Sequence, residues 1–243
     1  RRRERKIKYL LRRFNSISIR ELSGVRLCKK LGVQAQYVID PVFLIEPQNY
    51  LDIVRNAPYS AGEKKHIFGY FRDPSEVKLA QIKGIASRYD LDVFIADDTT
   101  PVEQFLLMIS SAEYVLTDSY HGLCFSLIFQ KEYGCYYNTL RGNDRFETLI
   151  EVLGINSKKF LPENENATAL VAVQCPEDWD TVNRNVLAQR ENGVRWLLNA
   201  LNNPPSVDEE KLKKAYWNEK LGNAGYVVRE KLLHKRITRK QIG

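Results

Sequence analysis

Short apolar stretches alternate with longer mixed stretches along the middle of this chain. The apolar runs predict buried strands at residues 66–71, 91–96, 114–116 and 132–137. The mixed stretches that follow them predict helices at residues 75–89, 101–111, 122–129 and 145–153. Strands and helices that trade places across short connections are typical of a doubly wound, mostly parallel sheet. We therefore predict an α/β fold of the Rossmann type.

The pattern is less regular on both sides of this region. N-terminal to it we expect a basic helix at residues 1–13, a strand at 14–20, a short helix at 20–30, a brief strand at 37–39 and a loop with a short helix at 42–51. C-terminal to it we expect a polar loop at 161–167 and a long helix at 179–201.

Two stretches predict domain boundaries. Residues 56–63, NAPYSAGE, are rich in turn-forming residues and typical of a linker. Pro204 and Pro205 end the last long helix, because proline cannot continue it. These signals predict domain boundaries near residues 62 and 204 and a basic helical tail at residues 205–243.

The net charge of +7 is concentrated at the two ends of the chain. Residues 1–36 hold 12 Lys or Arg and 2 Asp or Glu, and residues 205–243 hold 10 and 5. Basic ends can meet a nucleic acid, an acidic polymer or a membrane surface, although a solvated helix face explains most such charges. No zinc-finger, KH or RNP signature supports nucleic acid, so we expect no nucleic-acid partner.

Apolar content and cysteine spacing exclude other classes. No apolar run approaches the roughly 20 residues of a membrane-spanning helix, and no apolar signal region follows the charged start. We therefore expect a cytoplasmic protein, whose basic ends could contact the inner membrane surface peripherally. The four cysteines show neither a disulfide framework nor the spacing of a metal site, so we expect no metal.

Candidate catalytic residues are concentrated in the polar turn TDSYH at residues 117–121, between a predicted buried strand and a predicted buried helix. Ligands of open α/β sheets bind beyond the carboxyl ends of the strands, where helix-start amides attract anions. His121 could transfer a proton there. The same residues also suit structural roles, because Asp118 and Ser119 are good N-caps and a histidine near a helix start is often structural. Arg20 lies at a strand-to-helix junction as well.

Four motifs together resemble the polysaccharide pyruvyl transferase family. They are ISIREL at 17–22, IDPVFL at 39–44, LTDSYHGLCFSLIFQKEY at 116–133 and DRFETLIEVLG at 144–154. The resemblance covers about residues 5–201 and implies two Rossmann-like domains, as in GT-B glycosyltransferases, with the active site in the cleft between them. It implies that residues 1–62 are the end of an incomplete N-terminal domain, since family members carry a further N-terminal stretch. Residues 63–204 would then be the C-terminal domain.

The resemblance also implies an activity. Family members move pyruvate from phosphoenolpyruvate onto two hydroxyls of a sugar in a cell-surface polysaccharide, which forms a cyclic ketal and releases phosphate. The expected partners are phosphoenolpyruvate, as a substrate with no cofactor, and a glycan or lipid-linked oligosaccharide acceptor. Arg20 and His121 match the family's functional arginine and histidine. A guanidinium can grip either anion of the donor, and an imidazole can serve as acid and then base.

Five further residues are candidates for substrate binding. Ser119 and the Gly122 amide could hold the phosphate, and Gly122 would let the backbone approach the ligand closely. Asp118 could orient His121 or cap the helix, and we favour capping. Arg145 could be a second anion clamp or pair with Asp144 or Glu147. Glu21 could accept a sugar hydroxyl or pair with Arg20.

Two other function classes stay open at this stage. A glycosyltransferase with a nucleotide-sugar donor would use the same fold, because fold does not settle function. A non-catalytic basic module could bind acidic glycan or nucleic acid through the two ends of the chain. His66 and His234 are not part of any motif with other candidate catalytic or metal-binding residues, and we expect them to be structural or surface residues.

Overall fold

The computed structural model describes residues 2–55, 57–137, 143–162 and 169–203, together with residues 210, 214, 217 and 218. The chain divides into two compact units, residues 1–19, 24–36 and 197–243 in the first and residues 20–23 and 37–196 in the second. The boundaries at residues 62 and 204 stay predictions. The predicted basic tail lies almost entirely outside the described residues.

The first unit holds α1 (Arg2–Leu11), β1 (Ser18–Ile19) and most of α2 (Leu22–Lys30). Gly32 follows α2 with a φ of +64°, a left-handed conformation that favours glycine. The strand predicted at residues 14–20 is reduced to two residues. It pairs with β2 (Gln36–Tyr37) and is extended by a hydrogen bond from the Gln36 amide to the Ile17 carbonyl at 3.0 Å.

A five-stranded parallel sheet forms the second unit, with the strand order β4-β3-β5-β6-β7. The strands are β3 (His66–Tyr70), β4 (Asp92–Ala96), β5 (Tyr114–Thr117), β6 (Glu132–Tyr137) and β7 (Phe160–Pro162). The prediction of a doubly wound parallel sheet is confirmed. The loop predicted from residue 161 is wrong at its start, because a three-residue strand is too short to show an alternating pattern. Residues 163–167 lie outside the described residues.

Helices join and cover these strands. They are α3 (Pro47–Arg55), α4 (Glu76–Tyr89), α5 (Val102–Ser111), α6 (Tyr120–Ile128), α7 (Asp144–Leu153), α8 (Ala169–Gln174) and α9 (Trp179–Asn202), with short 3-10 turns η1 (Pro41–Leu44) and η2 (Ser157–Lys159). The long helices follow the sequence predictions closely, since the Ser75 hydroxyl caps α4 and Gly154 ends α7 at a φ of +71°. The six-residue α8 was not predicted.

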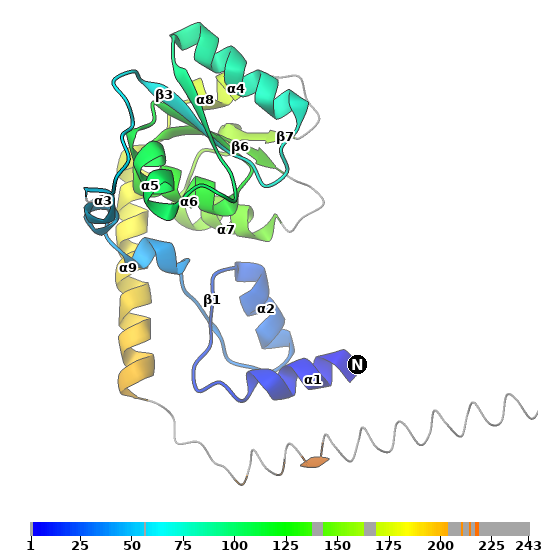
Figure 1. Ribbon diagram of the computed structural model, residues 1–243. Coiled ribbons are helices and arrows are strands. Elements are labelled where there is room, and N and C mark those ends of the chain that lie inside the picture. The colour runs from blue at the N-terminus through cyan, green and yellow to red at the C-terminus, as the bar shows by residue number, and fades with distance from the viewer. Residues whose placement is uncertain are drawn as a thin grey trace, which may run out of the picture. The chain divides into compact units, whose positions relative to one another are not determined.

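Both faces of the sheet are buried. Ile67 and Leu116 belong to a core shared with α4 and α8, and their neighbours Phe68 and Val115 belong to a core shared with α5, α6, α7 and α9. Figure 1 shows α4 and α8 on one side of the strands and α5, α6 and α7 on the other. The strands β3, β5 and β6 therefore need apolar residues at successive positions, which explains their continuous runs in the sequence, whereas the edge strand β4 is largely exposed.

Residues before the sheet also enter this core. Ile39, Phe43 and Tyr50 are 1%, 0% and 8% exposed. The Tyr50 ring lies edge-on to Phe125 of α6, with ring centroids 5.1 Å apart. The segment of η1 and α3 is thus part of the second unit and packs against its helices.

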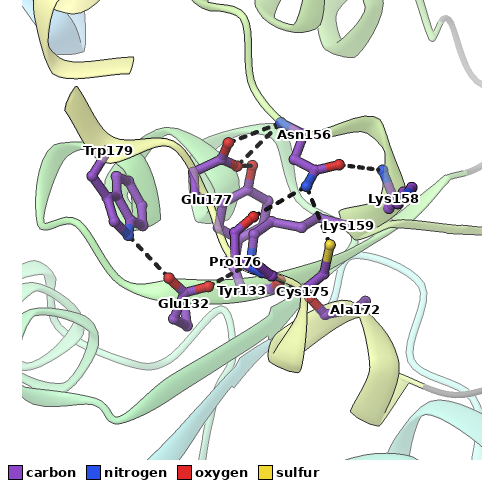
Figure 2. Close-up of polar contacts among 10 residues, drawn as sticks. All are labelled: Glu132, Tyr133, Asn156, Lys158, Lys159, Ala172, Cys175, Pro176, Glu177 and Trp179. Carbon is purple, nitrogen blue, oxygen red and sulfur yellow. Dashed lines mark hydrogen bonds and ion pairs between the residues drawn. The ribbon is translucent and has the colours of Figure 1, made fainter. Parts of the chain in front are cut away.

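Hydrogen bonds from a buried lysine hold the N-terminal end of β6 in place, as Figure 2 shows. Lys159 is fully buried, and its ammonium donates to Glu132 at 2.5 Å. The Trp179 indole donates to the other Glu132 oxygen at 2.9 Å, and the Tyr133 hydroxyl donates to Glu177 at 2.8 Å. Each of these buried polar groups has a partner, so the cluster is structural.

The strand order reverses between β3 and β5. β4 follows β3 in sequence and lies on one side of it, whereas β5 lies on the other. The connections from the carboxyl ends of β3 and β5 therefore leave in opposite directions, and a crevice opens between them. This is the place where an open parallel sheet binds its ligand.

None of the helices among the described residues is long and apolar enough to cross a membrane.

Candidate functional site

A pocket of about 350 Å³ lies at the carboxyl ends of β3 and β5. Its walls come from the residues after β3, the turn between β5 and α6, and the start of α7. The lining residues are Tyr70, Arg72, Asp73, Asp118, Ser119, Tyr120, His121, Arg145 and Phe146. The sequence placed the polar turn of residues 117–121 at such a position, and it lies at the reversal of strand order.

Hydrogen bonds fix the turn that carries His121. The buried Thr117 hydroxyl donates to the Tyr70 carbonyl at 2.5 Å and accepts from the Ser119 amide at 3.0 Å. The Ser119 hydroxyl accepts from the Gly122 amide at 3.4 Å and is therefore the N-cap of α6. The amides of Tyr120 and His121 then lie in the first turn, where a helix offers no acceptor of its own.

Gly122 is required for packing against the turn. A Cβ atom at Gly122 would lie 2.3 Å from the Thr117 hydroxyl and 3.0 Å from its Cβ. The expectation that Gly122 lets the backbone approach a ligand is not supported, since the side-chain direction is filled by Thr117. Its amide already donates to Ser119, so the amides of Tyr120 and His121 are the better anion donors of this helix start.

Asp118 has a different partner from those expected. It is buried, and one of its oxygens accepts from the Lys78 ammonium at 2.7 Å. Its two oxygens also accept from the amides of Arg72 and Asp73 at 2.5 and 3.2 Å. The favoured prediction that Asp118 caps α6 is wrong, because Ser119 does so. Asp118 instead fastens the residues after β3 to the turn after β5.

Arg20 and His121 meet at one carboxylate. A terminal nitrogen of Arg20 donates to Oδ2 of Asp40, and His121 Nε2 lies 4.0 Å from the same oxygen. Asp40 is 2% exposed, and its other oxygen accepts from the Val42 amide at 3.2 Å. Residues that lie about 100 positions apart in the sequence are thus brought together. Arg20 itself lies beside the pocket rather than among its lining residues.

Two guanidinium groups lie against the ring of Tyr120. The central carbons of Arg20 and Arg145 lie 5.0 and 5.3 Å from the centre of its ring. Glu21 lies 3.9 Å from Arg20 and 4.0 Å from Arg145. Of the alternatives left open, Glu21 pairs with Arg20, and Arg145 pairs with Glu21 rather than with a neighbour on α7. Such cation–π contacts hold the two cations side by side near the pocket.

The loop that carries Arg20 is tied to α7. The Leu22 amide donates to the Thr148 hydroxyl at 3.2 Å, and that hydroxyl donates to the Asp144 carbonyl at 2.7 Å. Thr148 is 3% exposed, so these bonds are shielded from water. They hold Arg20 beside Arg145, which is at the start of the same helix.

The environment of His121 favours a neutral imidazole. Burial lowers the pKa of His121, and the charge of Asp40 raises it. Arg20 and Arg145 lower the pKa further, and the net direction is down from the ordinary value. The side chain is still 49% exposed, so a substrate can reach it. A neutral imidazole can accept a proton at physiological pH.

Several lining or neighbouring residues were not identified from the sequence, among them Asp40, Tyr70 and Arg72. Asp40 follows a predicted strand, and Tyr70 and Arg72 lie at the end of another, which is the same signal that pointed to residues 117–121. The same signal is therefore present at these two strand ends. His66 is structural as expected, since its ring Nε2 lies 2.7 Å from the Met108 carbonyl.

The fold and site define an α/β protein whose pocket, at the reversal of strand order, is bordered by several cations and one histidine. The family model described as polysaccharide pyruvyl transferase matches residues 1–138, more than half of the chain. The chain belongs to the polysaccharide pyruvyl transferase family. The matched region includes Arg20, Asp40 and His121 and ends before Arg145. No curated protein and no solved structure matches the chain.

Proposed function

We propose that this protein transfers pyruvate from phosphoenolpyruvate onto two hydroxyls of a sugar in a polysaccharide or its lipid-linked precursor, with release of phosphate. The observation that carries the proposal is the convergence of Arg20 and His121 on Asp40, next to a pocket that Arg145 also lines. Family membership supports the reaction class. The donor, the acceptor and a cytoplasmic site of action are part of the proposal.

The cations suit the donor. Phosphoenolpyruvate carries a carboxylate and a phosphate, and guanidinium groups bind both with paired, charge-assisted hydrogen bonds. The guanidinium carbons of Arg20 and Arg145 lie 5.0 and 5.3 Å from the centre of the same Tyr120 ring, so one anion can reach both. Asp40 holds Arg20 in place, and Glu21 lies close to both arginines.

The reaction requires two proton movements. A proton is added to the methylene carbon of the donor, which becomes a methyl group, and the adjacent carbon becomes electron-poor. The first sugar oxygen bonds to that carbon and loses its proton. The bond to phosphate then breaks, with its electron pair leaving on the phosphate, and the second sugar oxygen bonds to the same carbon. The two hydroxyl protons thus end on the methyl group and on the released phosphate.

His121 suits the proton transfers. Its imidazole, when protonated, can give a proton to the methylene carbon, and the neutral imidazole that remains can take the proton of the attacking hydroxyl and pass it to the departing phosphate. The second hydroxyl then returns a proton to the imidazole. Positioned acid–base groups contribute roughly 10²- to 10⁴-fold to a rate. The positive charge of the pocket stabilises the negative charge that gathers on the phosphate as its bond breaks.

Replacing His121 tests this proposal. We expect His121→Gln to lower pyruvyl transfer by roughly 10²- to 10⁴-fold and to leave the fold intact, because the side chain is half exposed. Phosphate release and the mass of the sugar product measure transfer, and circular dichroism measures folding. Lys83→Gln, on the exposed side of α4, is the control and should behave as wild type. Near-normal transfer by His121→Gln contradicts the role, and nucleotide release from a nucleotide sugar would assign glycosyl transfer instead.

A further inference from the structure

One cation on the pocket wall has no role in the scheme above. Arg72 follows β3 and lines the pocket together with His121 and Arg145. Its backbone amide donates to Asp118 at 2.5 Å, and Asp118 is itself held by the buried Lys78 ammonium at 2.7 Å. The main chain of Arg72 is therefore fixed against the turn that starts α6, although its side chain is 58% exposed.

The partners of the Arg72 guanidinium can be exchanged for a ligand. Its ion pair is with Asp98, at 3.7 Å, and Asp98 is 92% exposed. Exposed ion pairs of this kind contribute little free energy. A hydrogen bond with Tyr70 raises the pKa of Arg72, as do the charges of Asp98 and Asp73, so this side chain stays protonated. An anion in the pocket would gain a cation that is loosely held in the free protein.

The positions of the cations match a ligand with two anionic groups. Arg20 and Arg145 both contact the Tyr120 ring, and Arg20 pairs with Asp40 while Arg145 lies at the start of α7. Arg72 comes from β3, which is the strand next to β5 on the other side of the strand reversal. The carboxylate of Asp118, which also lines the pocket, is matched by the Lys78 charge and so repels an anion less.

We propose that Arg72 binds the phosphate group of the donor and leaves the carboxylate to Arg20 and Arg145. This inference rests on the proposed function. The most exposed of the three arginines is assigned to the phosphate because that group must leave through the open side of the pocket: Arg72 is 58% exposed, and Arg20 and Arg145 are 34% and 35% exposed. Arg72 thus acts as a donor-binding residue just after the end of β3.

Binding measurements with the two halves of the donor test this assignment. Isothermal titration calorimetry on the full chain would use inorganic phosphate as one probe and pyruvate as the other. We expect Arg72→Ala to weaken phosphate binding by about tenfold or more, because a charge-assisted hydrogen bond is lost, and to leave pyruvate binding unchanged. The KM for phosphoenolpyruvate should rise by a similar factor. Arg88→Ala, at the exposed end of α4, is the matched control and should bind both probes as wild type.

Three results would overturn the inference. They are wild-type protein that binds no phosphate, an Arg72→Ala variant that binds phosphate as tightly as wild type, and a variant that loses pyruvate binding instead. These results are separable from failure of the proposed function, which His121→Gln tests. A normal Arg72→Ala variant beside an inactive His121→Gln variant removes only the phosphate assignment.

Discussion

At the scale of single residues, the charges around His121 determine what the imidazole can do. Burial, Arg20 and Arg145 lower its pKa, and Asp40 opposes them. A donor with two anionic groups would offset the two arginines. The pKa of His121 would then be low in the free protein and higher once the donor is bound. The protonated imidazole of the bound state can give a proton to the methylene carbon.

We therefore predict that inorganic phosphate raises the pKa of His121. An added negative charge favours the imidazolium, so the histidine should titrate at a higher pH with phosphate than without it. Nuclear magnetic resonance of the imidazole signals measures this directly, because the chain has only three histidines and His121→Gln identifies the signal. A pKa that stays constant or falls on addition of phosphate contradicts the prediction.

Two substitutions provide controls of opposite sign. Arg145→Gln should raise the pKa of His121 in the free protein, because one of the charges that lower it is removed. Asp40→Asn should lower the pKa, because the charge that raises it is removed. Shifts in the same direction would show that the charges named here do not govern the titration.

The sequence identified some of these residues and missed others for a physical reason. Arg20 and His121 each lie within a recognisable motif, so both could be proposed together. Asp40 and Arg72 become significant only when the neighbours of each strand are known, and the strand order is a property of the folded sheet. Lys78, which neutralises Asp118, lies 40 residues before it in the sequence.

At the scale of elements, local sequence signals were sufficient to predict the long helices. The Ser75 cap locates the start of α4, and the left-handed Gly154 locates the end of α7, each within a residue or two. β7 and α8 were missed, because an element of three or six residues is too short to show a period. These two elements depend on pairing with β6 and packing on its face, which no local pattern records.

Two helical glycines give a matched prediction. Gly122→Ala should lower the free energy of unfolding by about 1–3 kcal/mol, because the new Cβ would displace Thr117 from its bonds to Tyr70 and Ser119. Gly84→Ala should raise it by about 0.5–1 kcal/mol, because nothing lies within 4 Å of the new Cβ and alanine favours the helix. Urea denaturation measures both.

The contrast between the two variants is informative in itself. Equal effects of the same sign would show that helix propensity, and not the contact with Thr117, decides the outcome. Gly122→Ala should also reduce pyruvyl transfer, since Thr117 fixes the turn that carries His121. Gly84 lies on the exposed side of α4 and serves as the activity control.

At the scale of the whole molecule, the alternation of apolar and mixed stretches predicted a doubly wound parallel sheet correctly. The alternation cannot show the order of the strands, because the strands all read as apolar runs, whatever their position in the sheet. Nor does it show that residues 37–55, which precede the sheet, belong to the same compact unit as the sheet.

Truncation at the predicted linker tests how strongly the unit depends on this early segment. A fragment of residues 63–203 loses Ile39, Phe43 and Tyr50, which are buried in the core with α6 and α9. Each such side chain contributes about 1.5–3 kcal/mol when it is buried. The combined loss is comparable to the 5–15 kcal/mol that typically stabilises a domain, so we expect the fragment to be largely unfolded.

A fragment of residues 37–203 is the control for this truncation, because it retains all three side chains and should unfold cooperatively. It also keeps the hydrogen bond from Arg190 of α9 to the Phe43 carbonyl at 2.8 Å, which ties the early segment to the last helix. Circular dichroism melting curves of the two fragments measure the difference. The fragment of residues 63–203 could instead melt as cooperatively, and at the same temperature, as the fragment of residues 37–203. Residue 62 would then be a true domain boundary, and the core would be stable without residues 37–62.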